Sequence, residues 1–202
     1  AFREIMEPLE GRVLVATFAS NIARVQQVLD ASADMGRSVA VLGRSMEQNF
    51  RIATDLGYLT YDPSMIVSKD KIKDHPDAKL VIATTGAHGE PMAGLARMAN
   101  RDHRFVEIQP GDTVIVSASP IPGNEEYIHR TINRLFQKGA NVLYDPVAKV
   151  HVSGHASQEE QKLLLNIVRP KHFLPIHGEL RQLRAHAGLA MEVGIPEKNV
   201  IV

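Results

Sequence analysis

Three histidines lie in one stretch of the chain, HVSGHASQEEQKLLLNIVRPKHFLPIHGE at residues 151–179. Side chains alternate between two faces of an extended segment, so His151, Ser153 and His155 are expected to point the same way. Two imidazoles, a hydroxyl and the unhindered amide of Gly154 supply convergent hydrogen-bond donors for a phosphate oxyanion. A polar turn of purely structural character fits the same residues equally well, and both interpretations stay open.

The third histidine, His177, stands between the strand-like run HFLPI and Gly178. An imidazole at the end of a strand can present a ring nitrogen to a divalent metal, and zinc commonly binds neutral imidazole. Zinc needs three or four ligands, and the sequence has no HxH or H-E-x-x-H motif to supply the others. A surface or hydrogen-bonded core histidine is therefore the simpler interpretation of His177 taken alone.

Ser20 and Asn21 form a second polar site, after an apolar run at 12–18 and before a helical pattern at 22–35. Backbone amides and the positive end of a helix dipole make such a position suitable for a phosphate. Simple capping of the helix by either side chain uses the same atoms and is the plainer alternative.

Strand-like and helical patterns alternate along most of the chain. Continuous apolar runs predict five buried strands, at 12–18, 38–43, 79–84, 113–118 and 141–144. Helices are predicted between them, at 22–35, 45–57, 91–99 and 125–138. Ser45 and Gln48 suggest a capping box for the second helix. The pattern indicates an α/β fold, a Rossmann-like doubly wound, mostly parallel sheet whose ligands bind beyond the carboxyl ends of the strands.

The layout changes near residue 155. A helix capped by Ser157 with Glu160, a break at Pro170, and a further strand, helix and strand are predicted, the last three at 171–176, 179–188 and 199–202. A tail of about 47 residues is short for an independent domain, so we expect it to complete a larger unit.

Composition limits the chemistry. Lys plus Arg and Asp plus Glu both number 23, which gives no overall attraction to nucleic acid or membrane. The absence of cysteine excludes disulfides, thiolate catalysis and cysteine-bound metals within this sequence. No apolar run reaches the roughly 18 residues that span a bilayer, and a cytoplasmic location is expected.

Taken together, these segments resemble the ribonuclease J family, which comprises metallo-β-lactamase-fold RNases with a β-CASP domain. The matching segments are ATFASNIARVQQVLDA at 16–31, VAVLGRSM at 39–46, TTGAHGEPMAGLARMA at 84–99, SASPIPGNE at 117–125, HVSGHASQEE at 151–160 and PIHGE at 175–179. The resemblance implies a β-CASP domain over residues 1–155 and a C-terminal fragment of the metallo-β-lactamase domain over residues 156–202.

The resemblance also implies 5′-to-3′ exonuclease and endonuclease activity, with two zinc ions between the two domains. By matching motif, His177 looks like the family's metal-binding histidine, and His155 looks like the β-CASP histidine that acts near the scissile phosphate. Two segments resemble those that hold substrate phosphate: His151, Val152, Ser153, Gly154 and His155, and, near the RNA 5′ end, Ser20, Asn21 and Ile22. In the intact enzyme the zinc pair would generate hydroxide, while His155 neutralises or protonates the departing oxygen.

One departure from the family is large. The first metal motif, HxHxDH, and the histidine and aspartate that complete the metal pair are absent. We therefore expect this chain to be the RNA-binding and active-site-completing part of a zinc-dependent ribonuclease. On its own, the chain is expected to be inactive and to hold no tightly bound zinc. The expected partners are RNA with a 5′-monophosphate end and the remainder of the lactamase domain, with a homo-oligomer for the intact enzyme. The alternative is a Rossmann-like small-molecule or nucleotide-binding module without nuclease activity, supported by the glycine-rich segment at 84–91.

Overall fold

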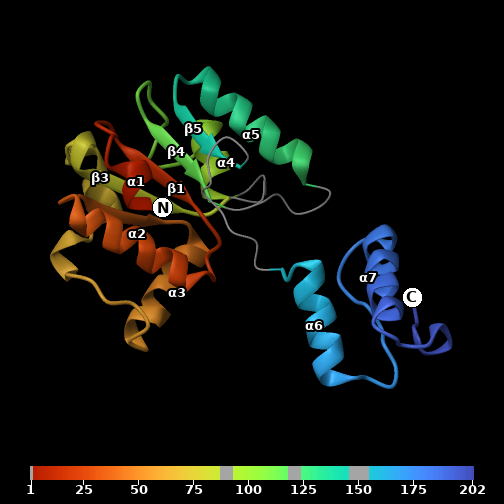
Figure 1. Ribbon diagram of the computed structural model, residues 1–202. Helices are drawn as coiled ribbons and strands as arrows, with labels where there is room; N and C mark the ends of the chain where they lie inside the picture. The colour runs from red at the N-terminus through yellow and green to blue at the C-terminus, as the bar shows by residue number, and fades with distance from the viewer. Residues whose placement is uncertain (1, 87–92, 118–123, 146–154) are drawn as a thin grey trace. The chain divides into compact units, whose positions relative to one another are not determined.

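The computed structural model describes residues 2–86, 93–117, 124–145 and 155–202 (Figure 1). The chain divides into two compact units, Ala1–Val152 and Ser153–Val202. Each unit has its own hydrophobic core.

The larger unit is built on one parallel sheet. Its strands are β1 (Val13–Ala16), β2 (Ser38–Leu42), β3 (Leu80–Thr84), β4 (Thr113–Val116) and β5 (Asn141–Tyr144). They lie in the order β2-β3-β1-β4-β5, and all four pairings are parallel. The predicted five-stranded parallel sheet is therefore confirmed.

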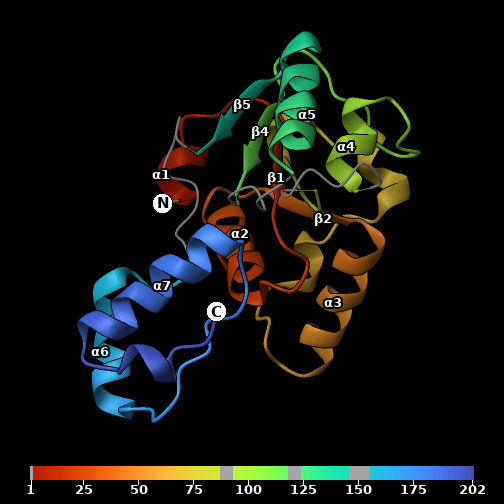
Figure 2. The same ribbon diagram turned by 90° about the vertical axis from the view of Figure 1, so that its right-hand side faces the viewer.

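Helices cover both faces of this sheet, as its continuous apolar strands require. They are α1 (Phe2–Met6), α2 (Ile22–Asp34), α3 (Arg44–Asp55), α4 (Gly94–Ala99) and α5 (Glu125–Gln137). Val13 and Val15 of β1 pack with α1, α2 and α3, whereas Leu14 and Ala16 pack with α4 and α5. Figure 2 shows α5 and α2 on opposite sides of the sheet. No helix in the described ranges is long and apolar enough to cross a membrane.

The start of α3 differs from the prediction. Gly43 is the N-cap, with φ at 112°, and it makes no side-chain cap hydrogen bond. Helix α3 therefore begins at Arg44, which places Ser45 inside the first turn, so the predicted Ser45–Gln48 capping box is wrong. A glycine reaches this backbone conformation without steric cost, and the chain can turn into the helix directly after β2.

A buried ion pair joins the amino ends of β1 and β4. Arg12 donates from Nε and Nη2 to the two carboxylate oxygens of Asp112, at 2.9 and 2.6 Å. Arg12 Nη2 also donates to the Glu107 carbonyl at 2.7 Å, and Asp112 accepts the Gln109 N–H at 2.8 Å. Arg12 Nη1 also lies 4.0 Å from the exposed carboxylate of Asp77. Because Arg12 and Asp112 are both buried, the close pair between them supplies most of the compensation for each charge.

The smaller unit consists mainly of two helices, α6 (Gln158–Val168) and α7 (Leu180–Glu192). The predicted capping box at the start of α6 is confirmed, because Ser157 and Glu160 exchange side-chain and backbone hydrogen bonds. The strands predicted at 171–176 and 199–202 are reduced to one parallel bridge, Phe173 to Val200. An isolated pair of short strands is only marginally stable without further strands.

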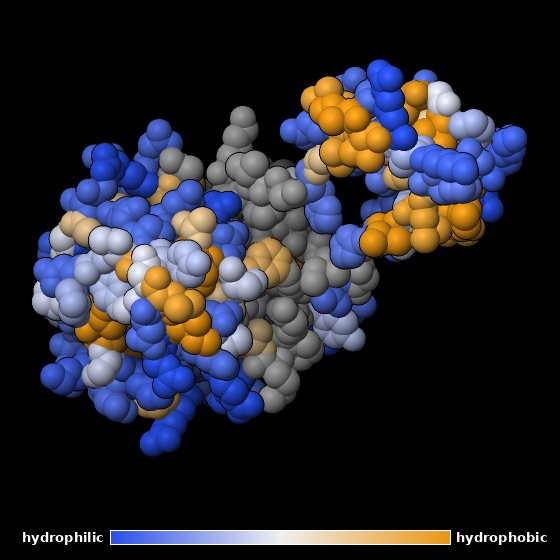
Figure 3. Space-filling model, turned by 90° about the horizontal axis from the view of Figure 1, so that it is seen from below, coloured by the Kyte–Doolittle hydropathy of each residue, from blue (hydrophilic) through white to orange (hydrophobic). Residues whose placement is uncertain are grey.

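The core of the smaller unit is small. Leu165, Ala190 and Ile195 are buried, with Phe173 and Val200 packed against them. Many large apolar side chains of this unit are instead exposed, as the orange areas in Figure 3 show. They are Leu163, Leu164, Ile167, Val168, Leu174, Ile176, Leu180, Met191, Ile201 and Val202.

Candidate active site

The structure brings together two of the predicted site residues within the smaller unit. The imidazole rings of His155 and His177 stack, with ring centroids 5.5 Å apart and an interplanar angle of 16°. Both residues are exposed. A stacked, accessible pair of imidazoles offers ring nitrogens that can bind a phosphate oxygen or a metal ion.

His155 is positioned by the start of α6. It lies two residues before Ser157, whose capping box fixes the first turn of that helix. The carbonyl of the intervening Ala156 accepts a hydrogen bond from Gln161 Nε2 at 2.9 Å. The backbone next to His155 is thus held by hydrogen bonds from α6.

His177 is positioned by a tight turn before α7. Its φ of 67° lies in the left-handed region, which is unfavourable for a residue with a side chain. Gly178 follows at a φ of 140°, and a Cβ there would lie 2.8 Å from Gln182 Oε1. That oxygen accepts the Glu179 N–H at 2.8 Å as part of the α7 capping box. Strained residues of this kind concentrate at functional sites.

The described residues do not complete a metal site. No group of three or more His, Asp or Glu side chains that could hold a metal ion occurs among them. His155 and His177 together supply at most two of the three or four ligands that zinc requires. A whole zinc site would need further ligands from outside these described residues.

The second predicted site lies at the carboxyl edge of the large sheet, between β1 and α2. Asn21 is the N-cap of α2, and its Oδ1 accepts the Arg24 N–H at 3.0 Å. Ser20 is exposed, while Asn21 and Ile22 are half-buried. Because the Asn21 oxygen serves as the cap, Ser20 provides the accessible hydroxyl beside the positive end of a thirteen-residue helix.

Two buried hydroxyls near the same sheet edge were not anticipated from the sequence. Thr17 follows β1 and Thr84 ends β3, and neither Oγ1 has a hydrogen-bond partner among the described residues. A Cβ on Gly94 would lie 2.2 Å from Thr84 Oγ1, so only glycine fits at that place. A threonine in an apolar strand carries no sequence signal that would distinguish it from an ordinary β-former.

Four residues of the predicted phosphate-binding segment lie outside the described residues: His151, Val152, Ser153 and Gly154. Their convergence with His155 therefore stays a prediction. Most of the glycine-rich segment at 84–91 also lies outside the described ranges.

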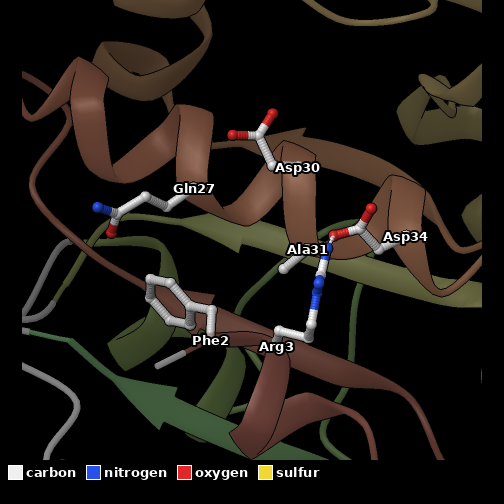
Figure 4. Close-up of a pocket in the computed structure, with 6 residues that line it drawn as sticks. All are labelled: Phe2, Arg3, Gln27, Asp30, Ala31 and Asp34. Carbon is white, nitrogen blue, oxygen red and sulfur yellow. Dashed lines mark hydrogen bonds and ion pairs between the residues drawn. The ribbon is translucent and has the colours of Figure 1, made fainter.

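A cavity of about 270 Å³ lies elsewhere, between α1 and α2. It is lined by Phe2, Arg3, Gln27, Asp30, Ala31 and Asp34. Figure 4 shows Arg3 reaching from α1 to Asp34 on α2, with which it forms an ion pair. The cavity contains none of the predicted site residues, and it is smaller than most ligand pockets. We assign it no role in catalysis.

Two family models match the chain. The model described as "Ribonuclease J, beta-CASP domain" matches residues 10–135, and the one described as "Zn-dependent metallo-hydrolase RNA specificity domain" matches residues 139–202. The first covers strands β1 to β4 of the parallel sheet, and the second covers β5 and both histidines of the stacked pair.

Several relatives are similar along almost the whole chain. Ribonuclease J from Thermus thermophilus is 50% identical over 95% of this chain and 33% of its own length. Ribonuclease J 1 from Streptococcus pyogenes is 45% identical over 98% of this chain and 36% of its own length. Ribonuclease J from Helicobacter pylori is 44% identical over 99% of this chain and 29% of its own length. The chain spans about a third of the length of these relatives, and it belongs to the ribonuclease J family.

Proposed function

We propose that the chain is the RNA-binding and active-site-completing part of a zinc-dependent ribonuclease that acts in RNA processing and decay. The stacked pair of His155 and His177 carries this proposal, because it places two predicted active-site side chains together on one small unit. Residues 1–155 would form the β-CASP domain, and residues 156–202 the C-terminal part of a metallo-β-lactamase domain. For the intact enzyme we propose both 5′-to-3′ exonuclease and endonuclease activity, a cytoplasmic location and a homo-oligomeric state.

In this proposal the two histidines have different tasks. His155 hydrogen-bonds the scissile phosphate and protonates the departing oxygen, a role that suits an imidazole near neutral pH. His177 is one ligand of the zinc pair, whose other ligands come from the lactamase segment outside this chain. The strained turn before α7 orients the His177 ring and holds it beside His155.

The RNA would be held by phosphate contacts in both units. The segment from His151 to His155 binds substrate phosphate through imidazole, hydroxyl and amide donors. Ser20, Asn21 and Ile22 bind the terminal phosphate of RNA with a 5′-monophosphate end. The exposed Ser20 hydroxyl and the positive end of α2 support that assignment.

The remainder of the lactamase domain is the proposed protein partner. The exposed apolar residues of the smaller unit support a large interface, because isolated soluble domains rarely expose so many large apolar side chains together. The relatives have about two thirds of their length outside the region that matches this chain, and we propose that part of it covers this surface.

The chain alone is expected to show no significant RNA cleavage and no tight zinc binding. One proposed zinc ligand cannot hold the ion, and the described residues contain no complete ligand group. Metal analysis after dialysis, combined with an RNA degradation assay, tests this expectation. Stoichiometric zinc or robust cleavage by the isolated chain would contradict it.

The chain should bind 5′-monophosphorylated RNA more tightly than the same RNA with a 5′-hydroxyl, and Ser20→Ala should reduce that preference about tenfold. A hydrogen bond to a charged phosphate is worth about this factor. Fluorescence anisotropy with both RNAs measures the preference. Ser64→Ala, at another exposed serine of the larger unit, serves as the control. Affinity that ignores the 5′ end would favour the alternative, a Rossmann-like small-molecule or nucleotide-binding module without nuclease activity.

A further inference from the structure

We propose that a cationic cluster beside strand β2, here called the Phe105 cluster, binds backbone phosphates of single-stranded RNA beyond the terminal nucleotide. The cluster consists of Lys69, Arg97, His103, Arg104 and Phe105. The inference rests on the proposed function, and it extends the RNA-binding surface to residues that the sequence patterns did not indicate.

Phe105 holds two cations in place. Lys69 Nζ lies 5.6 Å from the ring centroid and Arg104 Cζ lies 5.2 Å from it. The ring itself is half-buried and packs against the core that contains α4 and α5. Cation–π contacts of this kind restrict long, flexible side chains, so less conformational entropy is lost when they bind a phosphate.

The turn that carries Arg104 is held by His103. Its Nδ1 accepts the N–H groups of Phe105 and Val106, at 3.4 and 3.3 Å, which requires the ring to be unprotonated at that atom. Burial, followed by the nearby charge of Arg97, lowers the pKa of His103 below its usual value. The imidazole is therefore neutral at pH 7, and the positive charge of the cluster comes from its Lys and Arg residues.

The cluster lies near the carboxyl edge of the sheet, on the β2 side. Lys69 Nζ is 3.4 Å from Glu47 Oε2. Glu47 belongs to the first turn of α3, which begins directly after β2 ends. Ser20 follows β1, and β3 alone separates β1 from β2. At about 4.8 Å per strand, the two sites are about 10 Å or more apart along one edge, within reach of a short run of nucleotides.

The local charge balance favours a polyanion. Among the described contacts of the cluster, Glu47 is the one carboxylate that pairs with a cation, through Lys69. Arg97 donates to the neutral Asp102 carbonyl at 2.9 Å, and it forms no ion pair with the residues that the structure describes. Arg104 forms no ion pair within the described ranges, and it is exposed. Cations held together over one half-buried ring suit the backbone phosphates of a passing single strand.

The test compares a long and a short unstructured RNA, both 5′-monophosphorylated, by fluorescence anisotropy over a range of salt concentrations. In the double variant Lys69→Ala/Arg104→Ala, the long RNA should bind about tenfold more weakly. The slope of log affinity against log salt should fall by about 1.4, the value for two lost phosphate contacts on a single strand. The short RNA is a dinucleotide, which is too short to extend from the Ser20 region to the cluster, and it should bind as before.

Arg51→Ala/Lys79→Ala provides the matched control, because it also removes two exposed cations from the larger unit. Lys79 precedes β3 at the opposite edge of the sheet, and Arg51 lies in the second half of α3. Circular dichroism verifies that both variants are folded. The inference is overturned if the Lys69/Arg104 variant binds the long RNA with unchanged affinity and salt slope. It is also overturned if the control variant loses as much affinity for the long RNA. Either result leaves the proposed function intact. If the unaltered chain binds neither RNA, the proposed function fails together with this inference.

Discussion

Replacing His155 by alanine in the intact ribonuclease is expected to slow RNA cleavage by about 10²- to 10⁴-fold, the usual contribution of a general acid. The expectation follows from the exposed imidazole of His155 and its stacking on His177, the proposed zinc ligand. Single-turnover cleavage rates at saturating enzyme isolate the chemical step from substrate binding. RNA affinity should change far less than the rate, because the proposed phosphate-binding segment from His151 to His155 contains other donors.

His172→Ala is the matched control for this experiment. His172 is an exposed histidine of the same unit, five residues before His177 in the chain. Its removal alters composition and surface charge in the same way but leaves the stacked pair in place. His155 has no catalytic role if the two variants lose cleavage rate to a similar extent. The same conclusion holds if His155→Ala weakens RNA binding and leaves the cleavage rate unchanged.

The largest effect on stability is expected for Asp112→Ala, which should lower the free energy of unfolding of the larger unit by about 3–5 kcal/mol. The change leaves the buried Arg12 guanidinium without its bidentate carboxylate, with the exposed Asp77 carboxylate 4.0 Å away as a weaker partner. It also removes the acceptor of the Gln109 N–H. Arg12 and Asp112 have side-chain exposures of 6% and 4%, so water compensates little of the loss. Urea denaturation of the chain, followed by circular dichroism, measures the difference.

Glu126→Ala serves as the comparison, since it breaks the exposed pair of Arg130 and Glu126 on α5. Pairs of this kind contribute about 0.3–0.5 kcal/mol. If Asp112→Ala and Glu126→Ala lower the free energy of unfolding equally, the buried pair contributes no more to stability than the exposed one.

The architecture of the larger unit follows from local patterns. The strands are largely continuous apolar runs, and α2, α3 and α5 each have one apolar face. Both patterns are visible without knowledge of the tertiary structure. The start of α3 escaped prediction because a glycine at φ 112° replaced the side-chain cap that Ser45 suggested. Helix α1 escaped it because five residues are too few to display a helical period.

The candidate site could be predicted only as separate segments. The segments HVSGH and PIHGE each indicated a candidate active-site histidine. Their spacing in the sequence does not predict that His155 and His177 stack, because that contact depends on the path of the chain between α6 and α7. The Phe105 cluster was missed for a related reason. Lys69 and Arg104 are far apart in sequence, and they meet over one ring only after the sheet has formed.

The turn at His177 shows a conflict between stability and chemistry. A side chain held at a left-handed φ costs about 1 kcal/mol or more, a strain that glycine would not incur at the same place. Folding stability alone would therefore favour glycine at 177 as well as at 178. An imidazole at 177 makes the smaller unit less stable than it could be, and the compensating gain is a ring stacked on His155, where the proposed function places a metal and a phosphate.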